Sequence, residues 1–130
     1  YGQRQQMIET LGPVGYGEQR AAALLREGAD PQDIAWVRNG MQQLDPDGFL
    51  RAAWMLANDD IDRYLARYRG PLEVWCGEQD RITPPEKAAE LAREQDATLR
   101  LIAAAGHASY LDAPACFNRY LRDFTGAIQR

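Results

Sequence analysis

The first 69 residues carry apolar positions at helical spacing and no run that is typical of a strand. In the clearest case, apolar residues recur three and four positions apart and share one helix face: Ile34, Val37, Met41 and Leu44. The same spacing predicts helices within 17–28, 45–59 and 60–68. This half of the chain is therefore predicted to be all-helical.

Short polar residues stand where these helices are predicted to start, and a similar residue opens a helix in the second half. The predicted N-caps are Asp30, Asp45, Asp60 and Thr83. Glu86 follows Thr83 at the spacing of a capping box, and Gly28 is placed to end the helix 17–28. Helix boundaries are therefore predicted along most of the chain.

The second half alternates between strand and helix patterns. The runs 71–76 and 97–103 are short and apolar and predict buried strands, and each is followed by a helical pattern, at 83–95 and 114–128. This order predicts parallel strands joined by a crossover helix, an α/β arrangement. Two parallel strands leave apolar edges uncovered, so we expect either a missing N-terminal part or another copy of the chain to complete the sheet.

Composition narrows the class of protein. The 130 residues have a formal net charge of −4, which argues against a nucleic-acid partner. No apolar run approaches the ~20 residues of a membrane span.

The histidine and cysteine content bears on metal sites and redox state. With one histidine, Cys76 and Cys116, no zinc-site spacing exists, and no cofactor is expected. We expect two free thiols and a cytoplasmic location. The chain starts at Tyr1, which hints at a missing upstream segment.

Two residues that can support acid–base chemistry follow the predicted strands. Asp80 comes after the strand 71–76, and His107, the single histidine, comes after the strand 97–103. Because the carboxyl ends of parallel strands share one edge of a sheet, both residues are predicted to lie there. An aspartate that accepts from Nδ1–H of a histidine leaves Nε2 as a base for a hydroxyl. Taken singly, His107 fits a surface or core histidine and Asp80 a turn residue, so the hypothesis depends on the pair.

The segments "GPLEVWCGEQDRITPPEKAAELA" and "LRLIAAAGHASYLDAPACFNRYLRDF" resemble the C-terminal part of the α/β-hydrolase family. The resemblance covers 70–126 and implies that Asp80 is the acid and His107 the base of a catalytic triad. By the same resemblance, 1–69 is a helical cap and 70–130 is the C-terminal α/β segment of the core. More loosely, the cap is similar to those of enol-lactonase-like and carbon–carbon-bond hydrolases. The resemblance implies a serine hydrolase acting on an ester, a lactone or a related carbonyl bond.

The chain departs from the family at the nucleophile. It contains no G-x-S-x-G elbow, and its single serine, Ser109, is predicted to be a turn residue. Neither Cys76, in a predicted strand, nor Cys116, in the last helix, opens a helix after a strand, where a thiolate would be favoured. The nucleophile is therefore expected in a missing N-terminal part, and the chain alone is expected to be inactive. The alternative is an inactive remnant that self-associates or binds a partner.

Large apolar residues of the first half could line a substrate pocket: Trp36, Met41, Trp54 and Met55. Residues of this kind at helical spacing are more often core residues. Among them, Trp54 and Met55 are the candidates for substrate binding, because their helix is expected to run back toward the sheet.

Overall fold

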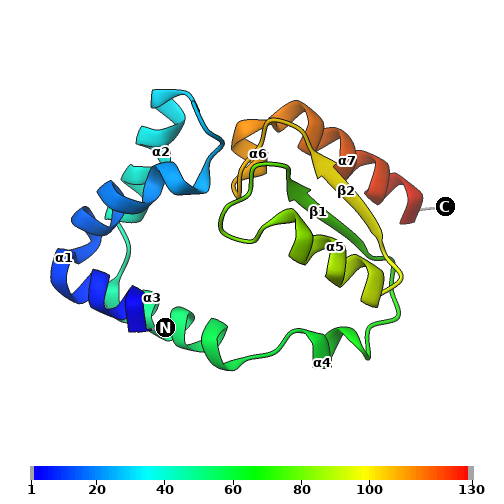
Figure 1. Ribbon diagram of the computed structural model, residues 1–130, viewed down its shortest axis with the longest axis horizontal. Coiled ribbons are helices and arrows are strands. Elements are labelled where there is room, and N and C mark those ends of the chain that lie inside the picture. Colours follow the sequence, from blue (N-terminus) through cyan, green and yellow to red (C-terminus); the bar gives the residue numbers. More distant parts are fainter. Residues whose placement is uncertain (1, 129–130) are drawn as a thin grey trace. The chain divides into compact units, whose positions relative to one another are not determined.

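The computed structural model describes residues 2–128, apart from the side chain at position 62, and its ribbon is shown in Figure 1. The chain forms two units. The helical unit comprises the residues up to Ala22 together with Pro31–Tyr68, and the α/β unit comprises Ala23–Asp30 together with the residues from Arg69 onward. The sequence placed one boundary between residues 69 and 70, whereas the structure groups 23–30 with the later residues.

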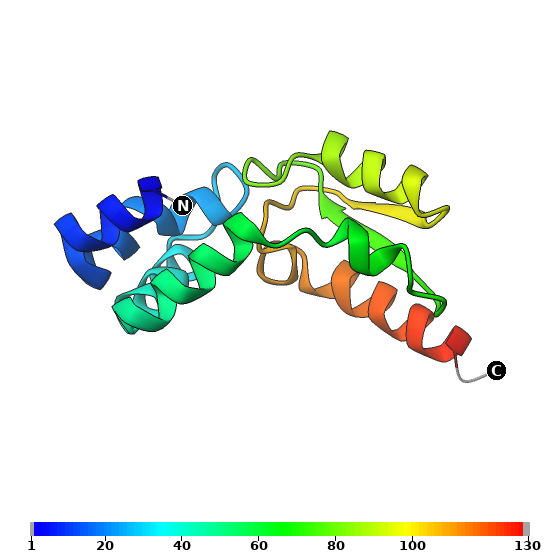
Figure 2. The ribbon, with the colours of Figure 1, turned by 90° about the horizontal axis from the view of Figure 1, so that it is seen from below.

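The helical unit contains α1 (Gly2–Arg20), α2 (Pro31–Gln42), α3 (Pro46–Asn58) and the short α4 (Asp62–Leu65). Helix α1, which is broken at Gly12 (φ 64°, ψ 179°), packs against both α2 and α3 (Figure 2). The ring of Tyr16 meets the ring of Phe49 edge-on, with centroids 4.9 Å apart. The described residues of this unit form no strand, as the sequence predicts.

The predicted helix starts are confirmed in one case and shifted in another. The Asp45 carboxylate accepts a hydrogen bond of 2.7 Å from the backbone N–H of Gly48, so Asp45 is the N-cap of α3. The prediction of Asp60 as a cap was wrong by one residue. The carbonyl of Ile61 accepts the first helical hydrogen bond, from the N–H of Leu65, and α4 starts at the next residue.

The prediction of one helix over 17–28 was also wrong. The α-helix ends at Arg20, a 3-10 turn (η1, Ala21–Leu24) follows, and Leu25 leaves the helical path. Leu25 is fully buried in the α/β unit, so tertiary packing overrides the helix propensity of this alanine- and leucine-rich stretch. Gly28 has a φ of 67° in the turn beyond and does not end a helix.

The α/β unit contains β1 (Glu73–Gly77), α5 (Pro85–Glu94), β2 (Thr98–Ile102), α6 (Ser109–Asp112) and α7 (Pro114–Ile128). The two strands pair in parallel, from Glu73 beside Thr98 to Gly77 beside Ile102. Helix α5 packs on both strands, and Figure 2 shows α5 and α7 on opposite faces of this small sheet. Trp75 of β1 meets Phe117 and Phe124 of α7 edge-on. The predicted parallel strands and crossover helix are confirmed.

Residues 24–26 are bound to the segment that follows β2. The N–H of Ala108 donates to the carbonyl of Leu24 at 2.8 Å. The Asp112 carboxylate, whose side chain is 1% exposed, accepts from the N–H of Arg26 and from the N–H of Gly106, both at 2.8 Å. These bonds explain why 23–30 belongs to the α/β unit although it lies between two helices of the other unit.

Replacing Asp112 with alanine is expected to lower the free energy of unfolding by about 2–4 kcal/mol, because two part-buried N–H groups lose their acceptor. Urea unfolding monitored by circular dichroism measures the loss. Asp123→Ala, an exposed position on α7, is the matched control and should change stability by less than about 0.5 kcal/mol. Equal effects of the two substitutions would contradict the role given to Asp112.

Candidate active site

The loops that follow the two strands are in direct backbone contact. The N–H of Gln79 donates to the carbonyl of Ala105 at 2.8 Å, just beyond the paired ends of β1 and β2. Gly77 makes this approach possible, since a Cβ atom there would collide with the carbonyl oxygens of Ala105 and Gly106. The two segments that carry Asp80 and His107 are therefore held side by side.

The structure brings together the two residues that the sequence singled out. Nδ1 of His107 lies 2.9 Å from Oδ2 of Asp80, which is hydrogen-bonding distance. Asp80 is 6% exposed, whereas the side chain of His107 is 40% exposed. A buried carboxylate thus holds one nitrogen of an imidazole whose ring reaches solvent.

The Asp80 carboxylate is surrounded by hydrogen-bond donors. Oδ1 accepts from the backbone N–H groups of Ile82 and Thr83, at 2.8 and 2.9 Å. Oδ2 accepts from the Thr83 hydroxyl at 2.9 Å and faces Nδ1 of His107. An ionised carboxylate offers about four acceptor positions, and these partners occupy them.

Burial and hydrogen bonding act in opposite directions on Asp80. Burial alone would raise the pKa of this carboxyl, because it disfavours the charged form. Hydrogen bonds from the backbone and hydroxyl of Thr83, from His107 and from the N–H of Ile82 outweigh burial and hold the pKa of Asp80 below its ordinary value. Asp80 is therefore ionised near neutral pH and acts as an acceptor, which directs the Nδ1 proton of His107 toward it.

This arrangement leaves Nε2 as the reactive nitrogen of His107. Both hydrogen-bond contacts of the ring within the described part of the chain involve Nδ1. With Nδ1 protonated, Nε2 of the neutral ring carries a lone pair. The pair can therefore accept a proton at Nε2 and stabilise the resulting imidazolium through Asp80.

The lowered pKa of Asp80 predicts an acid-dependent loss of stability. A carboxylate with a depressed folded-state pKa contributes stability that is complete above its unfolded pKa of about 3.9 and is lost as the pH falls through the folded pKa. The Asp80→Asn variant cannot titrate there, so its free energy of unfolding should fall less steeply below about pH 4 than that of the wild type. Urea unfolding at a series of pH values, with Asp123→Asn as control, measures this. Identical profiles of wild type and Asp80→Asn would refute it.

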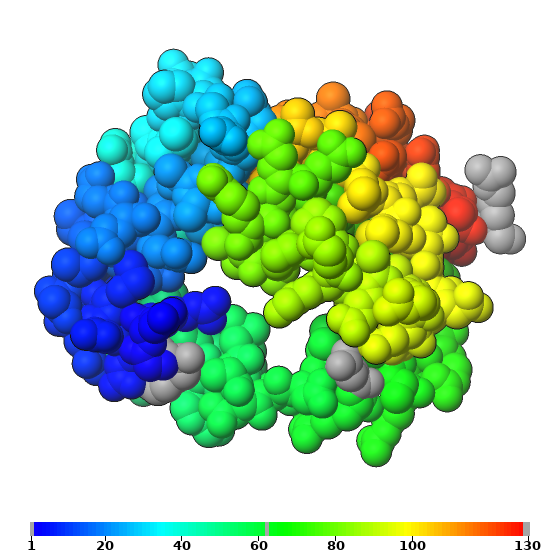
Figure 3. All heavy atoms as spheres, viewed as in Figure 1, coloured from blue at the N-terminus to red at the C-terminus, as the bar shows by residue number. Residues whose placement is uncertain are grey.

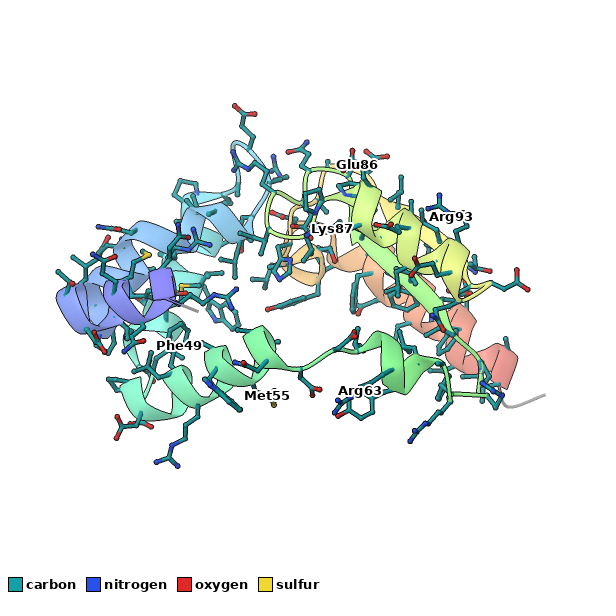
Figure 4. The ribbon with its side chains drawn as sticks, turned by 60° about the horizontal axis from the view of Figure 1, so that its bottom comes forward. Phe49, Met55, Arg63, Glu86, Lys87 and Arg93 are labelled. Carbon is teal, nitrogen blue, oxygen red and sulfur yellow. The ribbon has the colours of Figure 1, made fainter. Side chains whose placement is uncertain are left out.

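A cavity of about 330 Å³ lies beside the pair, between β1 and the first turns of α5. Its walls include His107, Cys76 and Lys87, the single lysine of the chain. Figure 4 labels Lys87 near the start of α5, and Figure 3 shows the β1–α5 loop at the surface of its unit. The cavity extends along β1, where no further strand is present among the described residues.

Neither cysteine nor Ser109 has the surroundings of a nucleophile. Cys76 is 6% exposed, and burial, followed by the charges of Asp80 and Glu86, raises the pKa of its thiol. Cys116 lies on α7, and both thiols are free, as predicted. Ser109, predicted in a turn, is the first residue of α6, and the described hydrogen bonds include none from its hydroxyl to His107. Groups of three or more metal-binding side chains are likewise absent from the described residues.

The other two predicted site residues, Trp54 and Met55, belong to the helical unit and lie on α3. Their side chains are more than half exposed, at 57% and 53%. Trp54 lines a shallow depression of about 420 Å³ with Asp47 and Arg51. Their role in substrate binding stays a prediction.

The prediction of Thr83 as an N-cap was wrong, and the sequence missed its contact with the pair. Helix α5 starts at Pro85, and its N-cap is Pro84, with φ −58° and ψ 152°. A residue that precedes a proline is pushed out of the helical region, so Pro85 keeps Pro84 extended and moves the helix start past Thr83. The Pro84-Pro85 pair was the signal that could have revealed this.

Comparisons with known proteins agree with this architecture. No protein-family model matches the chain. Over 137 aligned positions the chain is 28% identical to RutD of Pseudomonas savastanoi pv. phaseolicola, described as a carbamate hydrolase, and the match covers 95% of the chain and 50% of RutD. The solved structure of a thermophilic esterase from Thermogutta terrifontis is similar with a TM-score of 0.86 and 24% identity, over 98% of this chain and 49% of the esterase.

A second solved structure shows the same likeness. An esterase from Exiguobacterium antarcticum matches with a TM-score of 0.72 and 21% identity, over 95% of this chain and 45% of the esterase. The chain thus spans about half the length of the proteins it matches. No helix in the described part of the chain is long and apolar enough to cross a membrane. From its strands, its helices and these likenesses, the chain has the fold of the C-terminal part of an α/β-hydrolase.

Proposed function

We propose that this chain supplies the acid and the base of a serine hydrolase that acts on an ester, a lactone or a related carbonyl bond of a small molecule. Asp80 is the acid and His107 is the base, and the serine nucleophile lies outside these 130 residues. The observation that carries the proposal is the 2.9 Å contact between Oδ2 of Asp80 and Nδ1 of a half-exposed His107, at the carboxyl ends of two parallel strands.

The chemistry follows from the state of each group. Nε2 of His107 takes the proton of a serine hydroxyl as its oxygen attacks the substrate carbonyl, and then gives the proton to the leaving group. In the second half of the reaction a water molecule attacks the carbonyl of the acyl-enzyme, and His107 again acts as base. The proton then passes from His107 to the serine oxygen, which leaves as the acid product forms. Asp80 stays ionised throughout and stabilises the imidazolium, in keeping with its lowered pKa.

The missing part would also complete the sheet. Two strands alone leave strand edges open, and the cavity along β1 lies at such an edge. We propose that an N-terminal polypeptide occupies this edge and brings a G-x-S-x-G elbow and the oxyanion-hole donors. The free cysteines fit a reducing compartment, and we propose a cytoplasmic location.

A fusion protein tests the proposal. In the esterase of Thermogutta terrifontis, this chain replaces the half that it matches, and the hydrolysis of p-nitrophenyl acetate is measured. We expect turnover by the fusion and none by the chain alone. Turnover by the chain alone that Ser109→Ala abolishes, with the fold retained, would contradict the proposal, because the nucleophile would then lie within the chain.

The alternative function is that of an inactive remnant that self-associates or binds a partner. Its supporting observation is a set of large apolar side chains that stay exposed on the α/β unit: Leu101, Tyr110 and Leu121. Sedimentation of the purified chain distinguishes the two proposals. A stable homo-oligomer without any second polypeptide favours the alternative.

A further inference from the structure

The hydroxyl group of Thr83 does not cap a helix. Thr83 precedes the N-cap of α5, and no side-chain hydrogen bond caps that helix. The backbone N–H of Thr83 already donates to Oδ1 of Asp80 at 2.9 Å. The hydroxyl is a separate group of the same residue, held at the same carboxylate, and its two contacts are both to the Asp80–His107 pair.

Those two contacts form a triangle. Oγ1 of Thr83 lies 2.9 Å from Oδ2 of Asp80 and 3.2 Å from Nδ1 of His107, and Oδ2 lies 2.9 Å from Nδ1. A threonine hydroxyl has one proton to donate and two lone pairs to accept with. It can therefore donate to the carboxylate and accept from the ring at the same time.

Only one assignment of the protons satisfies all three sides of the triangle. If the hydroxyl donated to Nδ1, that nitrogen would carry a lone pair facing Oδ2 at 2.9 Å with no proton between them. Two acceptors at that distance repel each other, and a buried carboxylate oxygen would lose a donor. In the stable arrangement the Nδ1 proton points at Oδ2 and is shared with Oγ1 of Thr83, and the Thr83 hydroxyl donates its own hydrogen bond to Oδ2.

We propose that Thr83 is a positioning residue for His107. Its hydroxyl keeps the Nδ1 proton directed at Asp80 and thereby keeps Nε2 unprotonated. This inference rests on the proposed function, in which Nε2 is the base. The backbone N–H and the hydroxyl of Thr83 have different roles. The N–H holds one oxygen of the carboxylate, and the hydroxyl connects the other oxygen to the ring.

The single histidine makes the test direct, because every histidine ring signal of the chain comes from His107. Nitrogen NMR of the ¹⁵N-histidine-labelled full chain at alkaline pH distinguishes the Nδ1–H tautomer from the Nε2–H tautomer. The wild type is expected to show the Nδ1–H form as the dominant species. In Thr83→Val the hydroxyl is lost while the backbone N–H stays, and we expect a mixture in which the Nδ1–H share falls at least twofold.

Two further variants complete the design. Thr83→Ser keeps the hydroxyl and loses only the methyl group, so it should show the wild-type spectrum. A tautomer change caused by lost packing alone would appear in this variant as well. Thr98→Val, at an exposed threonine at the start of β2, is the matched control and should leave the tautomer unchanged. Circular dichroism of each variant verifies the helix content.

The outcomes separate this inference from the proposed function. A wild-type spectrum dominated by the Nε2–H form would overturn the Asp80–His107 arrangement and the proposed function with it. A dominant Nδ1–H form that Asp80→Asn abolishes but Thr83→Val leaves unchanged would overturn the role of Thr83 alone. Loss in Thr83→Val with recovery in Thr83→Ser supports it.

Discussion

Replacing His107 with alanine is expected to lower kcat of the active fusion by about 10⁴- to 10⁶-fold, with little change in KM. The imidazole touches the reacting hydroxyl in the proposed mechanism, so its loss removes the general base and the general acid together. The 40% exposure of the side chain means that the substitution leaves no deep cavity and should not unfold the protein. Initial rates of p-nitrophenyl acetate hydrolysis give the effect.

Two further variants test whether the loss of activity is specific to the proposed acid and base. Asp80→Asn keeps the shape of the acid but offers an amide to the ring, which favours the wrong tautomer, and should lower kcat by about 10⁴-fold. Cys116→Ala, on α7, is the control and should keep the activity of the parent fusion. A folded His107→Ala fusion that retains more than a tenth of the parent rate would exclude His107 as the base.

Replacing Gly106 with alanine is expected to destabilise the protein by about 3 kcal/mol or more. A Cβ atom at this position would lie 2.5 Å from the carbonyl carbon of Leu25 and 2.8 Å from the backbone nitrogen of Arg26. Both are backbone atoms of a segment that hydrogen bonds hold in place, so neither can move aside as a flexible side chain would. The adjacent His107 should shift with the strained loop, and activity of the fusion should fall as well.

The control for this substitution is Gly126→Ala. Gly126 lies in α7, and a Cβ atom there would meet nothing within 4 Å. Alanine in a helix interior is more favourable than glycine by about 0.5–1 kcal/mol, so this variant should be slightly more stable than the wild type. Urea unfolding compares the two. If Gly106→Ala were as stable as the wild type, the segment around Leu25 would not be packed against the loop that carries His107.

The sequence predicted those features that depend on local pattern. Apolar runs of strand length at 71–76 and 97–103 became the parallel pair β1 and β2, within one or two residues at their ends. Because parallel strands end at the same edge, the position of Asp80 after one strand and His107 after the other was enough to predict that they meet.

Features that depend on long-range packing were missed. Helix propensity predicted a helix through residue 28, but Leu25 gains more by burial beside a loop some eighty positions further along the chain than by staying helical. Thr83 was assigned by a capping pattern that ignores the rigidity of Pro85. At both positions a local preference was overridden, by tertiary packing at Leu25 and by the following prolines at Thr83. Both residues contact the segments that carry the candidate site.

The attachment of 23–30 to the α/β unit bears on how this protein can be re-engineered. A chain shortened to start at residue 69 would lack Leu25 and the N–H of Arg26, and the Asp112 carboxylate would keep only one of its two backbone partners. An exchange of the helical unit for the corresponding part of a related protein would therefore have to keep these eight residues as part of the recipient, with junctions on both sides of them. The loop that presents His107 would then keep the backbone bonds that hold it in place.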